Sequence, residues 1–132
     1  MIGRIVFAIF ALLPSASVAA NWQPLGTSTT RSMLFIDVSS ITFDGRHAEV
    51  WTRIDHSKDR TVSIRQTTAL WLLDCQESKS FIKSFTEYLP SGAVARTVSI
   101  PDGISTYEPV APDTFAENVL KVACWKYNAP DH

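Results

Sequence analysis

The chain has 132 residues, with 12 basic and 13 acidic side chains and a net charge of −1 at pH 7. This near-neutral balance argues against a dedicated nucleic-acid-binding protein, which would carry a strong basic excess. The length leaves room for one domain after a short leader. The two cysteines, Cys75 and Cys124, are too far apart for a CxxC redox or zinc motif.

The first twenty residues have the pattern of a cleaved secretory signal peptide. Arg4 precedes an unbroken apolar run at residues 5–13, which Pro14 ends, and small residues follow. A membrane anchor is the alternative, but the apolar stretch is shorter than the ~20 residues that a spanning helix needs. We therefore expect residues 1–20 to be removed by cleavage before Asn21, which leaves no stable membrane anchor.

The leader also bears on where the mature protein resides. No cysteine lies in or just after its apolar run, so the leader has no site for lipid attachment. We expect a periplasmic or secreted protein, with display at the cell surface as the alternative. Residues 21–127 are expected to form a single domain, and residues 128–132 are expected to form a flexible tail.

After the leader, the chain is predicted to form a succession of strands. Pro24 interrupts the first of them, and the dipeptide Asp44-Gly45 is the strongest hairpin signal in the chain. Polar turns, or turns that contain Pro and Gly, separate the later strands. The expected strands are residues 21–26, 32–38, 47–56, 61–75, 80–89 and 93–100.

Two of these strands show which way their side chains face. Residues 47–56 alternate in character, as a half-buried strand does. One face carries Ala48, Val50, Thr52 and Ile54, and the other carries His47, Glu49, Trp51, Arg53 and Asp55. The second half of residues 61–75 is apolar on both faces, which is typical of a strand in the middle of a sheet.

Helix signals appear only near the C-terminus. Residues 101–112 contain Gly103 and three prolines, so they should form an irregular connection. Thr114 and Glu117 then form a capping box, and apolar residues follow at helical spacing on one face. We expect one amphipathic helix over residues 114–126. The sheet is the only large apolar surface that could bury its apolar face.

The cysteine pair links the expected helix to the expected sheet. Two cysteines in a small exported domain usually pair. Cys75 ends the central strand on the face of Trp71 and Leu73, and Cys124 lies in the last turn of the helix. Closing this loop would stabilise the fold by roughly 4 kcal/mol in the chain-entropy model; two unpaired buried thiols are the alternative. The expected fold is α+β, an antiparallel five- or six-stranded meander sheet with one C-terminal helix packed on one face and tied by the disulfide.

The sequence contains no recognisable catalytic or metal site. His47 and His56 fall on opposite faces of one strand, so they cannot easily share a metal. Asp55, His56 and Ser57 are the residue types of a catalytic triad, but adjacent residues at a strand end point apart. The five glycines are scattered, so there is no phosphate-binding loop. We expect no enzyme activity, no metal and no cofactor.

A binding surface is the better candidate for function. The helix would cover one face of the expected sheet and leave the other open. If the alternation holds, the open face carries Trp51, Arg53 and Tyr88, and aromatic residues and arginine are enriched in protein interfaces. The alternative is that these aromatic rings pack in the core, where large aromatic side chains are usually buried.

Several short segments also resemble a known family. They are Trp22 with Leu25-Gly26, residues 35–41 (FIDVSSI), Val50-Trp51, residues 72–75 (LLDC) and residues 116–124 (AENVLKVAC). Their order and spacing resemble the surface-adhesin protein E family of Gram-negative bacteria across the whole mature chain. The resemblance implies an antiparallel sheet with a C-terminal helix tied to it by the two cysteines. It also implies a surface or envelope protein that binds host extracellular-matrix or plasma proteins.

The expected function is that of an exported, envelope protein-binding module, with adhesion to host matrix proteins as its specific form. The leader departs from the lipid-anchored member that names the family, because it lacks the cysteine for the anchor. The alternative is a soluble periplasmic protein that binds a small ligand or a cell-envelope component in a groove between sheet and helix. An uncovered edge strand would also allow a homodimer.

Overall fold

The computed structural model describes residues 3, 19–104 and 106–129. The expected signal peptide lies outside this range, apart from residues 3, 19 and 20, and so does the end of the expected tail at residues 130–132. Within the described residues, no helix is long and apolar enough to cross a membrane. The structure therefore describes most of the chain that follows the expected signal peptide.

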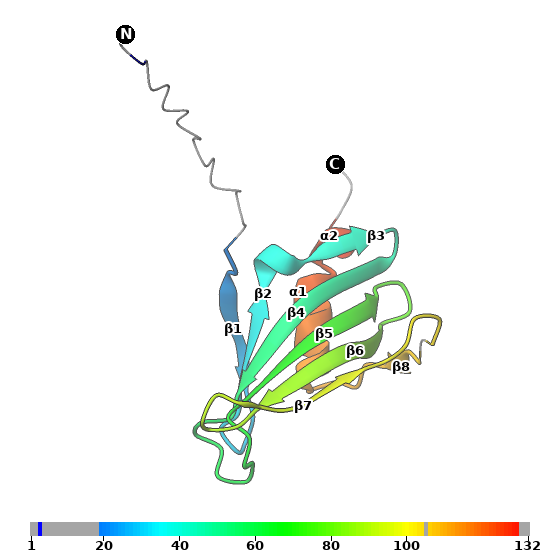
Figure 1. Ribbon diagram of the computed structural model, residues 1–132. Coiled ribbons are helices and arrows are strands. Elements are labelled where there is room, and N and C mark those ends of the chain that lie inside the picture. The colour runs from blue at the N-terminus through cyan, green and yellow to red at the C-terminus, as the bar shows by residue number, and fades with distance from the viewer. Residues whose placement is uncertain (1–2, 4–18, 105, 130–132) are drawn as a thin grey trace.

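An antiparallel sheet is the main element of the described residues (Figure 1). In the described part of the chain its strands are β1 (Trp22–Thr27), β2 (Met33–Asp37), β3 (Thr42–Asp44), β4 (His47–Asp55), β5 (Gln66–Asp74), β6 (Lys79–Tyr88), β7 (Val94–Ser99) and β8 (Glu108–Pro109). Six of them follow the order β1-β2-β4-β5-β6-β7, so the predicted meander is confirmed, with β5 in its interior. Two short strands raise the total to eight, because β3 pairs with the start of β4 and β8 with the start of β6.

The predicted Asp-Gly hairpin joins β3 to β4. Asp44 lies opposite His47, and Gly45 between them has a φ of +60°, a conformation that glycine adopts without strain. The serine turn before this hairpin is a single turn of 3-10 helix, η1 (Val38–Ser40), which the carboxylate of Asp37 caps. Local sequence signals therefore account for this part of the chain.

One strand begins later than predicted. The strand expected over residues 61–75 starts only at Gln66. Thr61 instead donates both its N–H and its O–H to Oδ1 of Asp59, at 2.9 and 2.5 Å. These bonds hold the chain in a turn, so residues 61–65 belong to a loop rather than to the sheet.

Helical structure near the C-terminus is divided into two pieces. α1 (Phe115–Ala123) begins at the predicted cap, where Thr114 Oγ1 accepts the N–H of Glu117 at 3.2 Å, while the carboxylate of Glu117 reaches back to the N–H of Asp113 rather than to that of Thr114. A single further turn, α2 (Trp125–Asn128), follows it. Between them, Cys124 has backbone angles of φ −93° and ψ 11°, outside the helical range, at the residue that carries the disulfide. The single helix expected to run to residue 126 is therefore interrupted in its last turn.

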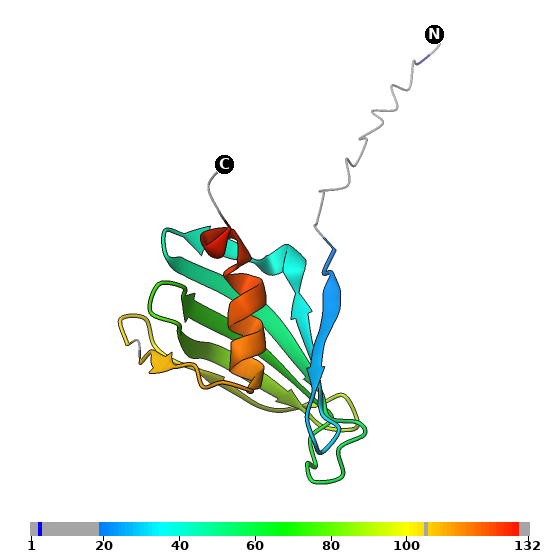
Figure 2. The same ribbon diagram turned by 180° about the vertical axis from the view of Figure 1, so that it is seen from behind.

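A disulfide between Cys75 and Cys124 holds the end of α1 at the end of β5. Figure 2 shows α1 lying across one face of the sheet. The core between them uses the faces predicted from the alternation, and its members include Leu34, Ile36, Ala48, Val50, Ala69, Trp71, Leu73, Val119 and Ala123. The predicted fold, an antiparallel sheet with a C-terminal helix tied to one face, is therefore confirmed.

Candidate functional site

Within the described residues, no helix packs on the face of the sheet opposite α1 (Figure 1). We call this side the open face, and the strand register places Trp51, Arg53 and Tyr88 on it, as the alternation predicts. Trp51 and Arg53 are two positions apart on the same face of β4. Tyr88 lies on β6, in the line of paired side chains across the strands that is next to the line containing Arg53. Trp51 is 39% exposed, so it is not a core residue. The structure therefore brings the three expected residues onto one surface.

Arg53 is held in place by two aromatic rings. Its guanidinium carbon lies 4.6 Å from the centroid of the Trp22 ring and 5.5 Å from that of Phe35. A cation above an aromatic face is attracted by the negative charge density of the ring, by about 0.5–1 kcal/mol at an exposed site. The three side chains form a preorganised aromatic and cationic patch next to Trp51.

Sequence reasoning missed Trp22 and Phe35 as partners of Arg53. Phe35 lies directly opposite Arg53 in the β2–β4 pairing, whereas Trp22 comes from β1, the next strand outward. The sequence shows each as an aromatic residue in an expected strand. Their meeting depends on the register of three strands, which the alternation within one strand does not determine.

A second cluster, which consists of polar side chains, lies where the β1–β2 turn meets the loop after β4. Asp59 is buried and accepts hydrogen bonds from the hydroxyls of Ser32, at 2.6 Å, and Thr30, at 2.7 Å. Donation by Ser32, Thr61 and Thr30 holds the pKa of Asp59 well below its usual range, because these bonds favour the carboxylate. Ser32 Oγ also contacts Nδ1 of His56 at 2.7 Å.

This cluster contains Ser, His and Asp, but it is not arranged as a catalytic triad. In a triad the imidazole lies between the hydroxyl and the carboxylate, whereas here Ser32 lies between His56 and Asp59. The other ring nitrogen of His56 contacts Thr67 Oγ1 at 2.9 Å, and Ser32 is buried. The network therefore fixes the loop after β4 against the β1–β2 turn. In the described residues no three His, Cys, Asp or Glu side chains are grouped to hold a metal.

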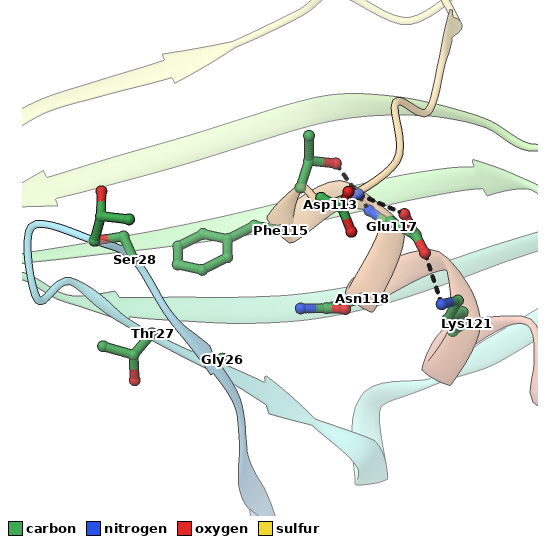
Figure 3. Close-up of a pocket in the computed structure, with 10 residues that line it drawn as sticks. Gly26, Thr27, Ser28, Asp113, Phe115, Glu117, Asn118 and Lys121 are labelled. Atoms are coloured by element: carbon green, nitrogen blue, oxygen red, sulfur yellow. Dashed lines mark hydrogen bonds and ion pairs between the residues drawn. The ribbon is translucent and has the colours of Figure 1, made fainter.

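A cleft of about 630 Å³ lies between the β1–β2 turn and the start of α1 (Figure 3). Its residues include Gly26, Ser28, Phe115 and Asn118. A Cβ on Gly26 would lie 3.2 Å from Asn118 Nδ2 and 3.6 Å from Phe115 Cε1, so the missing side chain allows β1 to approach α1 closely. Asn118 Nδ2 also donates to the Leu25 carbonyl at 3.4 Å. The cleft lies between β1 and α1, where the alternative function expects a groove for its ligand.

Charges line the helix side of this cleft. Glu117 forms an ion pair with Lys121 at 2.6 Å and accepts the N–H of Asp113 at 2.7 Å. The hydrogen bond from Lys121, followed by that from Asp113, lowers the pKa of Glu117. The carboxylate of Asp113 adds negative charge, and the end of β1 and the turn after it carry the hydroxyls of Thr27, Ser28 and Thr29 on the opposite side. The cleft is therefore polar, weakly acidic and rich in hydrogen-bonding groups, with one aromatic ring.

A comparison with known protein families identifies the family to which this chain belongs. The family described as "Surface-adhesin protein E" matches residues 22–125, a range that includes the strands of the open face and the cleft. The chain belongs to this family. Membership supports a surface adhesin rather than an enzyme. A comparison with curated proteins gave no match.

Solved structures of Haemophilus influenzae protein E have the same fold as this member of the adhesin E family. The crystal form II structure has a TM-score of 0.57 at 15% identity, covering 89% of this chain and 98% of that chain. A second structure of the same protein has a TM-score of 0.56 at 16% identity, covering 92% and 96% of the two chains. At these identities the likeness establishes the fold alone.

Proposed function

We propose that this protein is an exported surface adhesin that binds a protein partner through the open face. The observation that carries the proposal is the stack of Arg53 on Trp22 and Phe35 beside the exposed ring of Trp51. Tryptophan, tyrosine and arginine most often dominate interface energies. Because the stack already orders Arg53, binding would lose less side-chain entropy.

We propose host extracellular-matrix proteins as the partners, because the family resemblance implies them. Adhesion requires exposure outside the cell, so protease treatment of intact cells should degrade the protein. Protection until the outer membrane is opened would place the protein in the periplasm and would contradict the adhesin role.

Replacing Trp51 or Arg53 with alanine should weaken binding to a matrix protein by about tenfold or more, as expected for interface hot spots. The measurement is surface plasmon resonance of the exported, purified protein over immobilised vitronectin and laminin. Trp125→Ala is the matched control, because Trp125 is 58% exposed on α2, away from the open face.

Two results would contradict this proposal. One is the absence of saturable binding to either matrix protein. The other is equal loss of affinity in Trp51→Ala and Trp125→Ala, which would mean that the open face has no special role.

The cleft between β1 and α1 favours a second candidate function, the binding of a small neutral envelope component such as a saccharide. The ring of Phe115 offers an apolar surface, and Asp113, Asn118 and the threonine hydroxyls offer hydrogen-bond partners. Pockets of this kind combine apolar walls with a few polar groups that orient the ligand. The acidic character of the cleft disfavours an anionic ligand.

Thermal unfolding in the presence of soluble cell-wall saccharides should show stabilisation if the cleft binds them, by about 2.7 kcal/mol at a hundredfold excess over Kd. Phe115→Leu should remove this stabilisation. Phe43→Leu is the control, because Phe43 is a half-buried ring on β3, outside the cleft. No shift in the wild-type protein, or the same shift in both variants, would exclude the cleft as the binding site.

A further inference from the structure

β7 forms one edge of the sheet, and all six of its residues are exposed. Within the described residues its backbone pairs only with β6. An edge strand presents unpaired N–H and C=O groups that another strand can bind. We call this free side of β7 the outer edge (Figure 1).

The hydrogen-bond pattern shows which groups lie on the outer edge. Ile100, just after β7, donates its N–H to the carbonyl of Lys83 on β6 at 2.9 Å. In an antiparallel ladder, residues facing the same neighbour alternate, and the β6–β7 register is unbroken through this stretch. Val98 therefore faces β6, whereas the N–H and C=O groups of Thr97 and Ser99 face away from it. Four backbone groups are thus available to an added strand.

The opposite edge of the sheet is protected, and the outer edge is not. On β1, Pro24 has no N–H, and the pairing with β2 shifts between Pro24 and Gly26. Proline, charged side chains and irregular pairing are common protections of an exposed edge. β7 contains no proline, its one charged residue, Arg96, is paired with Glu87, and its one irregularity lies before Arg96, so the stretch from Thr97 to Ser99 has none of these protections.

Side chains of paired residues form rows that cross the sheet from strand to strand, and these rows end at β7, the last strand. On the open face, Thr68, Thr86 and Thr97 lie side by side, and the last two hydroxyls are 3.2 Å apart. On the helix side, Phe85 lies opposite Val98, which is 37% exposed. A further strand would extend both rows, with a β-branched residue beside Thr97 and an apolar residue beside Val98.

The charge of Arg96 restricts which residues an added strand could carry beside β7. Arg96 donates two hydrogen bonds to Glu87, at 2.9 and 3.1 Å, and its guanidinium lies 5.3 Å from the Phe85 ring centroid. Its charge is thus already compensated by Glu87, so Arg96 offers no unpaired charge to a charged residue of an added strand. The rows and the charge together describe an uncharged, extended segment in which apolar and β-branched residues alternate.

We propose that the outer edge of β7 binds such a segment of a partner protein as an additional strand. The backbone of Thr97 and Ser99 would supply the hydrogen bonds, and the side chain beside Val98 would supply selectivity. The inference rests on the proposed protein-binding function, but it uses a different surface from the open face.

The test variant is Thr97→Pro. It removes an N–H that the β6–β7 pairing does not use, and proline is tolerated at an edge position whose N–H faces solvent. Thr97→Val is the matched control, since it keeps the backbone donor and a side chain of the same shape. If Thr97→Pro fails to fold, Thr97→Lys replaces it, because a lysine protects an edge while leaving the backbone unchanged.

A displayed library of short linear peptides is selected on the exported, purified protein. We expect enriched peptides that bind Thr97→Val like the wild type and Thr97→Pro about tenfold or more weakly. These peptides should protect the Thr97 and Ser99 amides from hydrogen exchange and should still bind Trp51→Ala. The last result separates this inference from the proposed function of the open face.

The inference is overturned if no peptide is enriched or if the enriched peptides bind Thr97→Pro as well as the wild type. Loss of binding in Trp51→Ala but not in Thr97→Pro would assign the peptides to the open face. A dimer in sedimentation that Thr97→Pro dissociates would show that a second copy, not a partner peptide, occupies the outer edge.

Discussion

Replacing both Cys75 and Cys124 with alanine should lower the free energy of unfolding by about 4 kcal/mol. The two residues are 49 apart in sequence, so the bond removes much of the conformational freedom of the unfolded chain. Alanine suits both positions, because Cys75 and Cys124 are buried in the core and alanine adds no polar group there. For a single small domain, a loss of this size is a large share of the total stability.

Urea unfolding of the exported protein, followed by tryptophan fluorescence, measures this effect. Wild-type protein under reducing conditions should behave like the double variant, which separates the loss of the bond from the loss of the side chains. Thiol labelling of the denatured, unreduced protein should modify neither cysteine. A difference in stability below about 1 kcal/mol would show that the bridge does not constrain the unfolded chain as the entropy model requires.

Trp71→Ala should destabilise the fold by about 3–5 kcal/mol, the usual range for removing a large aromatic side chain from a core. Trp71 is 8% exposed in the core between β5 and α1. Its indole N–H donates to the hydroxyl of Thr52, which is 1% exposed, at 2.7 Å. Truncation therefore creates a cavity and leaves a buried hydroxyl without this partner, and both effects cost stability.

A double-mutant cycle separates the two effects. Trp71→Phe removes the donor and keeps most of the ring, so it should cost about 1–3 kcal/mol through the unpaired hydroxyl. Adding Thr52→Val removes that hydroxyl and should recover part of the loss. The control is Trp125→Ala at an exposed position, which should change stability by no more than about 0.5 kcal/mol. Strict additivity of Trp71→Phe and Thr52→Val would contradict the importance of this hydrogen bond.

Features governed by neighbouring residues could be predicted from the sequence. The period-two alternation of residues 47–56 assigned Val50 and Thr52 to the core and Trp51 and Arg53 to the open face. This works because successive side chains of a strand point to opposite faces, whatever the strand pairs with. The Asp-Gly hairpin and the cap at the start of α1 were predictable for the same reason, since each depends on only a few consecutive residues.

Features that join distant segments depended on the tertiary structure. The predicted strand starts late because Thr61 binds the carboxylate of Asp59, and this carboxylate is also bound by Ser32, which is 27 positions away and has no local signal to mark it. The stack of Arg53 on Trp22, and the cleft between the β1–β2 turn and α1, likewise require segments that lie far apart in the chain.

By itself the sequence determined the six main strands apart from the start of β5, the start of the C-terminal helix, which face of β4 is buried, and which cysteines pair. These follow from local periodicity and from the tendency of two cysteines in an exported domain to bond. Only the tertiary structure decided which aromatic rings hold Arg53, where a cleft opens, and which edge of the sheet is unprotected. The physical reason is that each of these depends on strand register and long-range packing, which a pattern within one segment does not encode.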